Sequence, residues 1–459
     1  MENWLRKASE DVPDKIAVKY SGETITYKAL YEQADVLSRK IKSLGQNRLG
    51  VYIYNSLDSL KLIHALMQAG VEIVFINTRL TNHEITEQLK DVDVSTIIAT
   101  KRFEIDGFEV ISFDDLQQLQ MVDFESPAVN EDSILSIMFT SGTTGRAKAV
   151  KQTYLNHYAS AKGCESRFGY DTDSVWMQVN PIFHISGLSI VLRCVIAQCT
   201  NIVVDKFDEE KIFNLLKTDE VTHTSLVPIM LKRLLKIGND FGSNLQGILL
   251  GGAGVTKNVL KEALDNNLPV YNSFGMTETC SQIVSIPYHD EKILNGTVGK
   301  ALKNVQIKVD QNEELLVKAE NVTPGYLNAP IDEENGYFKT GDLASIDDEG
   351  YLYILDRRKD LIISGGENIY PKEIEDRVHE VSGIESCVVV KVQDEKWGEV
   401  PVLLIQGDQN IKSDILNHLS ETLARYKMPK EIYFVDEIIM TSTGKVSRQK
   451  NYERYIKNQ

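Results

Sequence analysis

The sequence predicts an α/β protein in which two doubly wound lobes and a small β-barrel precede a smaller α+β segment. Two stretches, residues 27–99 and 205–271, alternate helical and strand-like hydrophobic periodicity, which is typical of a parallel sheet. From residue 298 to 355 the helical pattern stops, and short apolar runs separated by glycine and asparagine indicate a small barrel or sandwich. A charged cluster at 356–360 then marks a boundary before residues 361–459.

The first lobe opens with an amphipathic stretch in which apolar Leu30, Ala34, Leu37 and Ile41 recur at helical spacing. Strand-like and helical segments follow in alternation. In chain order we expect helix 27–44, strand 49–54, helix 57–68, strand 71–76, helix 82–90 and strand 95–99.

The second lobe repeats this alternation. We expect helix 211–216, strand 222–227, helix 230–237, strand 245–250 and helix 257–265. In the helix-free region that follows, strands are expected at 305–309, 315–318 and 351–355.

Composition and charge exclude several classes of protein. The 50 lysines and arginines against 66 aspartates and glutamates give a formal net charge of −16 without a local basic patch, so we expect no nucleic-acid partner. No apolar run reaches the roughly 18 residues that span a bilayer, and the first residues lack a signal-peptide pattern. We therefore expect a cytoplasmic protein without a membrane span; a homo-oligomer is left open. The 5 scattered cysteines and 8 histidines lack the spacing of a disulfide framework or transition-metal centre.

The strongest chemical signal follows the apolar strand 134–139. Hydroxyls, glycines and cations crowd into the string Thr140-Ser141-Gly142-Thr143-Thr144-Gly145-Arg146-Ala147-Lys148. Glycines let backbone N–H groups turn inward, hydroxyls add neutral donors, and cations offset negative charge, which is chemistry for phosphate. The spacing is not that of a Walker A loop, and a shorter piece of this string would be an ordinary surface turn.

Two acidic residues further along the chain suit other parts of a nucleotide. Glu278 is a hard carboxylate beside the hydroxyl of Thr277, and such a pair can hold Mg²⁺ and a phosphate oxygen. Asp342 follows Gly341 and can accept hydrogen bonds from both ribose hydroxyls. Taken alone, either acid could equally be a solvated surface residue.

The ordered motifs of the chain, which run from about residue 20 to 450, resemble those of the acyl-adenylate-forming enzymes: acyl-CoA synthetases, luciferases and peptide-synthetase adenylation domains. Besides the phosphate loop, the motifs are Pro181-Ile182-Phe183-His184, Gly251-Gly252-Ala253, Tyr271-Asn272-Ser273-Phe274-Gly275-Met276-Thr277-Glu278, Tyr337-Phe338-Lys339-Thr340-Gly341-Asp342, Asp356-Arg357-Arg358-Lys359-Asp360 and Ser442-Thr443-Gly444-Lys445. Ala147 stands at the family's usual proline and Asp356 at its usual glycine. We expect both departures to affect backbone stiffness rather than a reacting group.

This resemblance implies an AMP-forming acid–thiol ligase that uses ATP, Mg²⁺ and coenzyme A on a carboxylic acid. It implies an N-terminal domain (1–356), a hinge (357–360) that pivots at Lys359, and a mobile C-terminal cap domain (361–459). In the cap domain, Lys445 would serve adenylation, while Gly365 and Gly366 would line the route of coenzyme A.

The resemblance also implies a role for each remaining motif residue. The implied catalytic residues are Lys445, Glu278, Thr277 and His184, with the metal at Glu278 and Thr140. The implied nucleotide contacts are Thr140, Ser141, Gly142, Thr143, Thr144, Gly145, Lys148, Gly251, Gly252, Ala253, Ser273, Phe274, Gly275, Asp342 and Arg357. The implied acid contacts are Arg193, His184, Ser186, Gly187 and Thr277.

The chain also resembles, more narrowly, the branch of the family that activates o-succinylbenzoate on the route to menaquinone. This resemblance is carried by residues 76–80, 184–189 with Arg193, and 272–282. This acid carries two carboxylates, so the unreacted one needs a cation or several donors in an apolar pocket. Arg193 interrupts the apolar run 188–197 and can supply the charge; the alternative is a structural arginine paired with an acid such as Asp205. Another aryl- or fatty-acyl-CoA synthetase, or a non-catalytic nucleotide-binding regulator, remains a further alternative.

Overall fold

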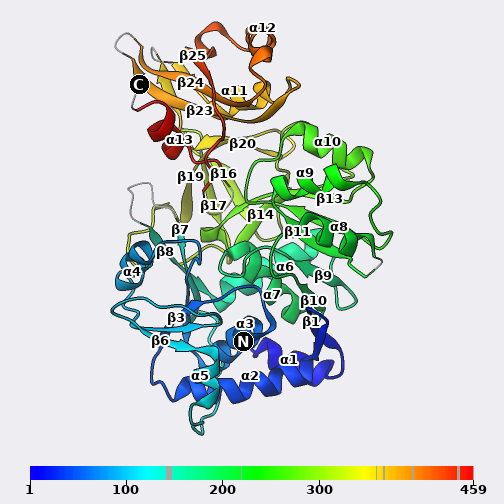
Figure 1. Ribbon diagram of the computed structural model, residues 1–459, viewed down its shortest axis with the longest axis vertical. Coiled ribbons are helices and arrows are strands. Elements are labelled where there is room, and N and C mark those ends of the chain that lie inside the picture. The colour runs from blue at the N-terminus through cyan, green and yellow to red at the C-terminus, as the bar shows by residue number, and fades with distance from the viewer. Residues whose placement is uncertain are drawn as a thin grey trace.

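Four sheets organise the described part of the chain, as the computed structural model in Figure 1 shows. The structure describes residues 1–140, 147–218, 220–357, 359–364, 367–394, 397–441 and 445–457. The helices of the large N-terminal part surround its two larger sheets, and the C-terminal part lies at the opposite end of the molecule from α1 (Trp4–Asp11). None of the helices built from the described residues has the length and apolar character of a membrane-spanning segment.

The first lobe is a six-stranded sheet, and the alternation predicted for it is confirmed. Its strands, in their order across the sheet, are β6 (Glu109–Ser112), β5 (Thr96–Ala99), β3 (Arg48–Tyr52), β4 (Glu72–Phe75), β7 (Ile134–Thr140) and β8 (Lys148–Thr153). Neighbours run parallel except β7 and β8. The helices are α2 (Tyr27–Lys42), α3 (Leu57–Ala69), α4 (Asn82–Lys90) and α5 (Phe113–Gln118).

Local sequence signals set the ends of these helices. Thr26 starts α2 by accepting a hydrogen bond from the N–H of Ala29, and Thr81 and Glu84 cap α4 reciprocally. Gly70 ends α3 with a left-handed φ of 66°, a conformation that glycine adopts without strain.

The second lobe is a nine-stranded sheet that combines strands from two distant parts of the chain, residues 16–26 and 175–301. Its strands are, in order, β15 (Lys300–Ala301), β14 (Ser281–Pro287), β13 (Val270–Met276), β12 (Gly247–Leu250), β11 (His223–Leu226), β9 (Val175–Gln178), β10 (Thr200–Val203), β1 (Ile16–Tyr20) and β2 (Glu23–Thr26). The helices are α6 (Tyr154–Phe168), α7 (Ile185–Ala197), α8 (Glu209–Lys217), α9 (Pro228–Ile237) and α10 (Lys257–Asp265). One apolar core, which contains Leu62 of α3 and Leu188 and Leu192 of α7, joins the two lobes.

Five antiparallel strands form the helix-free region, where the sequence predicts a small barrel or sandwich. They are β16 (Gln306–Val309), β17 (Glu314–Lys318), β18 (Glu333–Glu334), β19 (Tyr337–Ile346) and β20 (Leu352–Arg357). Leu315, Val317 and Leu352 of this third sheet share a core with Ile283 of β14, so the sheet packs against the edge of the second lobe.

The C-terminal part has its own sheet and its own core. The strands are, in order, β22 (Glu367–Ile369), β21 (Ile362–Ser364), β24 (Gly398–Gly407) and β23 (Ile384–Asp394), and β25 (Glu431–Phe434) pairs with β24. The helices are α11 (Pro371–Val378), α12 (Lys412–Thr422) and α13 (Arg448–Tyr455). Ile374, Leu403 and Leu419 lie in the core between helices and sheet.

Candidate functional site

Four of the predicted residues meet where the C-terminal part faces the third sheet. Asp342 on β19 and Arg357 on β20 are cross-strand neighbours, and Arg357 Nε lies 2.7 Å from Asp342 Oδ1. Glu278 and Lys445 lie close enough to this pair to act on the pKa of Asp342. Although part of Lys445 is exposed, removal of its ammonium from water lowers its pKa; Arg357 adds to this effect, while Asp342 and Glu278 oppose it.

Asp342 is buried and keeps one carboxylate oxygen free for a ligand. Its backbone N–H donates to Thr340 Oγ1 at 3.1 Å, and Gly341 turns the strand with a φ of 72°. Burial raises the pKa of Asp342 to about 6, an effect that the Arg357 ion pair only partly offsets. In the described part of the chain, Oδ2 has no hydrogen-bond partner. This oxygen suits the ribose hydroxyls that the sequence assigns to Asp342.

Glu278 is buried in a short 3₁₀ turn, η1 (Thr277–Thr279), and its carboxylate is oriented by Tyr326. The Tyr326 hydroxyl donates to Glu278 Oε1 at 3.0 Å. The Lys148 ammonium lies 4.7 Å from the centroid of the Tyr326 ring, so Tyr326 stands between a cation and an acid of the predicted phosphate site. A buried carboxylate beside Lys148 fits the hard oxygen donor that Mg²⁺ prefers.

The ends of the predicted phosphate loop are held by segments far away in sequence. Thr140 and Lys148 are paired partners at the ends of β7 and β8, while Ser141, Gly142, Thr143, Thr144 and Gly145 lie outside the described residues. Asn328 Oδ1 accepts from the Ala149 N–H at 2.8 Å, and Asn328 Nδ2 donates to Ala147 O at 2.8 Å. Residues 321–328, with Tyr326 and Asn328, therefore brace this loop, and the sequence analysis missed them.

The predicted adenine-side residues lie side by side at the ends of β12 and β13. Ser273 Oγ donates to the carbonyl of Leu250 at 2.7 Å, and a Cβ on Gly251 would lie 3.1 Å from Ser273 Oγ. Gly252 has a φ of 82°, which glycine adopts most readily. A Cβ on Gly275 would overlap the carbonyl oxygen of Ser281. The structure thus brings the Gly251–Ala253 turn and the Ser273–Gly275 segment together.

His184 precedes α7 and is neutral at physiological pH. Burial lowers the pKa of its ring to about 4, with smaller contributions from Arg79 and Lys445. Its Nε2 is buried and, within the described residues, lacks a hydrogen-bond partner. Next to it Ser186 is half-buried, and a Cβ on Gly187 would overlap the carbonyl oxygen of Pro181.

Arg193 lies inside the second lobe and is 2% exposed. Its Nη2 donates to Ser281 Oγ and to Gln282 Oε1, each at 3.0 Å, and the guanidinium lies over the Trp176 ring. The alternative pairing with Asp205 is wrong, because Asp205 pairs with Lys211 at 3.4 Å. Where the chain is described, Arg193 forms no ion pair, and its Nε has no hydrogen-bond partner.

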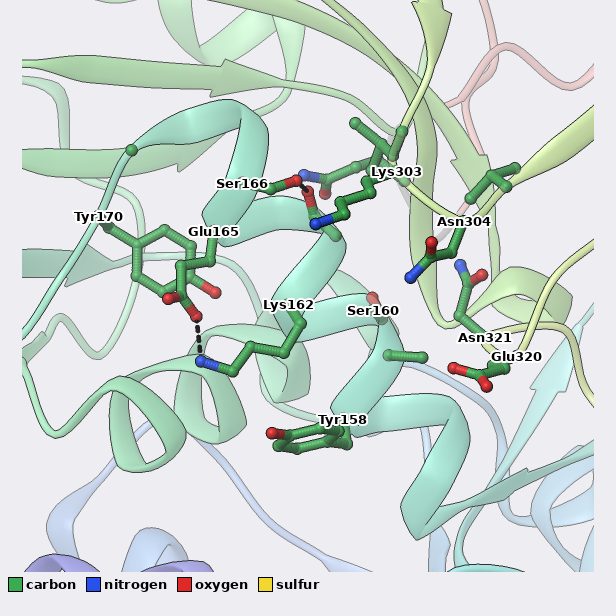
Figure 2. Close-up of a pocket in the computed structure, with 16 residues that line it drawn as sticks. Tyr158, Ser160, Lys162, Glu165, Ser166, Tyr170, Lys303, Asn304, Glu320 and Asn321 are labelled. Atoms are coloured by element: carbon green, nitrogen blue, oxygen red, sulfur yellow. Dashed lines mark hydrogen bonds and ion pairs between the residues drawn. The ribbon is translucent and has the colours of Figure 1, made fainter.

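A cavity of about 590 Å³ lies beside α6 (Figure 2). It lies between α6 and the segments 302–305 and 320–321, and Lys162 and Glu165 form a 2.6 Å ion pair at its wall. None of the predicted site residues lines it. Two of the described lining residues connect the cavity to the predicted site: Gln282 accepts a hydrogen bond from Arg193, and Asn321 donates at 2.8 Å to the carbonyl of Thr279, in the turn that carries Glu278.

Three further residues are predicted to act in the rotation of the C-terminal domain and at the route of coenzyme A. Lys359 is exposed in a turn in which the Asp360 N–H donates to Arg357 O at 2.9 Å. Gly365 and Gly366 lie outside the described residues, so their predicted role at the route of coenzyme A stays a prediction.

The chain is similar to known proteins along its full length. The family model described as "AMP-binding enzyme" matches residues 5–327, and "AMP-binding enzyme C-terminal domain" matches residues 373–445. A relative described as 2-succinylbenzoate–CoA ligase, from Staphylococcus epidermidis, is 46% identical, over 98% of this chain and 97% of its own length.

Solved structures of o-succinylbenzoate CoA synthetase from Bacillus subtilis are similar as well. The complex with the acyl-adenylate OSB-AMP has a TM-score of 0.93 at 32% identity, over 98% of this chain and 97% of that one. The complex with ATP and magnesium has a TM-score of 0.91 at 31% identity, over 98% and 99%. A doubly substituted form bound to the product analogue OSB-NCoA has a TM-score of 0.76 at 32% identity, over 98% of each chain.

Proposed function

The chain belongs to the AMP-binding enzyme family, and from this premise we propose that it is an ATP-dependent 2-succinylbenzoate–CoA ligase of menaquinone biosynthesis. It activates the acid as an acyl-adenylate with release of pyrophosphate, and then transfers the acyl group to coenzyme A. ATP, Mg²⁺ and coenzyme A are therefore required. The observation in this chain that carries the proposal is the meeting of Lys445 with Asp342, Arg357 and Glu278.

In the first half-reaction the acid's carboxylate attacks the α-phosphorus of ATP, so negative charge must be neutralised while pyrophosphate leaves. Asp342 holds the ribose through its free Oδ2, and Arg357 fixes the orientation of that carboxylate. Lys445 supplies a cation from the C-terminal part. Mg²⁺, when bound by Glu278 and Thr140, supplies further positive charge for the phosphate oxygens.

The second carboxylate of 2-succinylbenzoate binds at Arg193. A buried guanidinium without an acidic partner is costly, because its charge is removed from water without a counter-charge. The substrate's spare carboxylate supplies that counter-charge, either directly or through water. Ser281 and Gln282 hold the guanidinium in place from one side and leave its Nε without a partner.

His184 forms an uncharged wall between the nucleotide residues and the acid contact at Arg193. Because its pKa lies near 4, the ring stays neutral at the pH at which the enzyme works, and it does not repel Lys445. A neutral ring is suited to contact the acyl group or to gate the entry of the thiol, and it carries no role as a charged acid. Ser186 and Gly187 follow it at the start of α7, and Gly187 lets the helix pack closely against the carbonyl of Pro181 beside the acid site.

For the second half-reaction we propose that the C-terminal domain rotates about Lys359. The rotation withdraws Lys445 from the acyl-adenylate and brings the segment with Gly365 and Gly366 towards the thiol of coenzyme A. Both half-reactions thereby use one acyl site in succession.

Release of pyrophosphate from a panel of carboxylic acids tests the proposal. The protein is mixed with ATP, Mg²⁺ and each acid, with and without coenzyme A, and the thioester is identified by mass spectrometry. We expect turnover with 2-succinylbenzoate and much less with monocarboxylates. Preferred turnover of a simple aryl or fatty acid would assign another acyl-CoA synthetase, and nucleotide binding without pyrophosphate release would assign a regulator.

A further inference from the structure

Helix α11 begins without a capping side chain of its own. Its N-cap residue is Tyr370, which makes no side-chain cap hydrogen bond, and Pro371 occupies the first turn. The carboxylate of Asp356 fills this role, because its Oδ2 accepts from the backbone N–H of Lys372 at 2.7 Å. Aspartate suits this position, since it pairs a free N–H and places negative charge at the positive end of the helix.

Asp356 comes from a different part of the molecule than the helix it caps. It lies on β20 of the third sheet, where it pairs with Leu343 of β19. Helix α11 belongs to the C-terminal part and packs Ile374 into its core. Figure 1 shows β20 at the border between the two parts. The hydrogen bond therefore ties the C-terminal part to the large N-terminal part.

Arg448, the first residue of α13, adds an electrostatic contact to the same carboxylate. Its Nη2 lies 3.8 Å from Asp356 Oδ1, and its guanidinium also forms an ion pair with Glu375 of α11. Asp356 is 5% exposed, and burial raises its pKa against the influence of Arg448 and the Lys372 N–H. A buried carboxylate without partners is costly. Loss of both contacts would therefore destabilise the packing of α11 and α13 against β20.

The same contact governs the position of Lys445, which precedes Arg448 closely in the chain. The Thr441 N–H donates to Lys445 O at 2.6 Å, and Met440 pairs with Val446, so residues 445–446 lie beside residues 440–441 before α13 begins. Arg448 thus links the segment with Lys445 to Asp356 on β20 and, through a 3.5 Å ion pair, to Asp360, in addition to its bonds inside the C-terminal part. Any movement of α13 away from β20 carries Lys445 away from the site.

We infer that Asp356 is a positioning residue for the first half-reaction: its carboxylate latches α11 and Arg448 onto β20, so that Lys445 faces Asp342 and Glu278. The inference rests on the proposed function. It corrects the expectation that an aspartate at the family's usual glycine affects only backbone stiffness.

Separate measurement of the half-reactions tests this latch. Asp356→Gly removes the carboxylate, whereas Asp356→Asn keeps its shape and one acceptor but removes the charge. In Asp356→Gly we expect the rate constant of adenylation to fall about tenfold, the equivalent of about 1.4 kcal/mol, with the KM for ATP little changed. Thioester formation from supplied acyl-adenylate should be unchanged or faster, and Asp356→Asn should be intermediate.

The matched control is Glu437→Gln, which removes an exposed ion pair to Arg454 inside the C-terminal part and should change neither rate. Equal loss of both half-reactions in the Asp356 variants, or unchanged adenylation in Asp356→Gly, would overturn the latch.

Tryptic cleavage after the exposed Lys359, without substrates, separates the latch from the proposed function. We expect faster cleavage in both Asp356 variants than in the wild type and in Glu437→Gln, because loss of the latch frees the C-terminal part. Unchanged cleavage would overturn the inference even if the enzyme is active. If the wild type activates no acid, the proposed function fails, and the cleavage result still decides for or against the latch.

Discussion

Asp342 and Arg193 are buried charged residues that each keep a polar atom without a partner in the described part of the chain. These atoms are Oδ2 of Asp342 and Nε of Arg193. Folded proteins pair nearly all their buried polar atoms, because an unpaired one loses its bonds to water without replacement. At both positions the proposed ligand provides the missing polar partner. The ribose hydroxyls would bond to Asp342, and the spare carboxylate of the substrate would bond to Arg193.

The raised pKa of Asp342 predicts a pH dependence of ATP binding. Since this pKa is about 6, the carboxyl group gains a proton as the pH falls through that value, and it then loses acceptor capacity and its ion pair with Arg357. We expect the KM for ATP to rise below about pH 6 in steady-state assays. Asp342→Asn should have a high KM for ATP without this pH dependence. A wild-type KM for ATP that stays constant from about pH 5 to about pH 8 would contradict the role of Asp342 in holding the ribose.

Arg193→Leu should discriminate between dicarboxylate and monocarboxylate substrates. Loss of a charged hydrogen bond to the spare carboxylate should lower kcat/KM for 2-succinylbenzoate by about 1.5 to 3 kcal/mol. Analogues that lack this carboxylate should lose much less. If the melting temperature falls and all acids are affected alike, Arg193 has a structural role through Ser281, Gln282 and Trp176.

Lys445→Ala should impair adenylation and spare the second half-reaction. The ammonium faces Asp342 and Glu278, where charge develops only while pyrophosphate leaves. We expect the adenylation rate to fall by about 100-fold or more, roughly 3 kcal/mol, by comparison with the loss of one preorganised donor. Thioester formation from supplied acyl-adenylate is the control, and an equal loss there would refute the assignment.

At the scale of elements, the segment 321–328 bonds to the end of the predicted phosphate loop without contributing a motif. Asn328→Ala removes its hydrogen bonds to Ala147 and Ala149 at the end of the phosphate loop. We expect the KM for ATP to rise roughly tenfold, while the KM for the acid stays nearly unchanged. Asn312→Ala, at an exposed turn beside Asp310, is the matched control and should leave both constants as they are.

Sequence patterns located elements and motif residues well because both are local. The bounds expected for α4 and α10 agree with the structure to the residue, and the motifs of Asp342, Arg357, Glu278 and Lys445 do converge. The role of segment 321–328 was missed because its contacts join residues that are far apart in the sequence. Tyr326 bonds to a residue 48 positions away, and Asn328 bonds to one 179 positions away. Hydrophobic periodicity carries no information on such partners.

At the scale of the whole molecule, Lys359→Pro should separate the two half-reactions. Proline fixes φ near −65°, and no hydrogen bond among the described residues uses the Lys359 N–H, so the substitution restricts movement of the 357–360 turn and removes no donor that these residues use. We expect adenylation to be retained and transfer to coenzyme A to be largely lost. Lys359→Ala, which keeps the backbone free, should transfer normally; normal turnover of the proline variant would place the pivot elsewhere.

During synthesis, β1 and β2 emerge from the ribosome long before β10, the strand that pairs with β1. Val18 of β1 pairs with Asn201 of β10, so the outer edge of the second sheet cannot close until residue 203 has left the ribosome. At typical elongation rates this delay is about 10 to 40 s. During that time the β1–β2 hairpin can form, but one of its edges stays open to pairing with other nascent chains. The order of translation thus leaves the N-terminal hairpin with an open edge that can pair wrongly before folding ends.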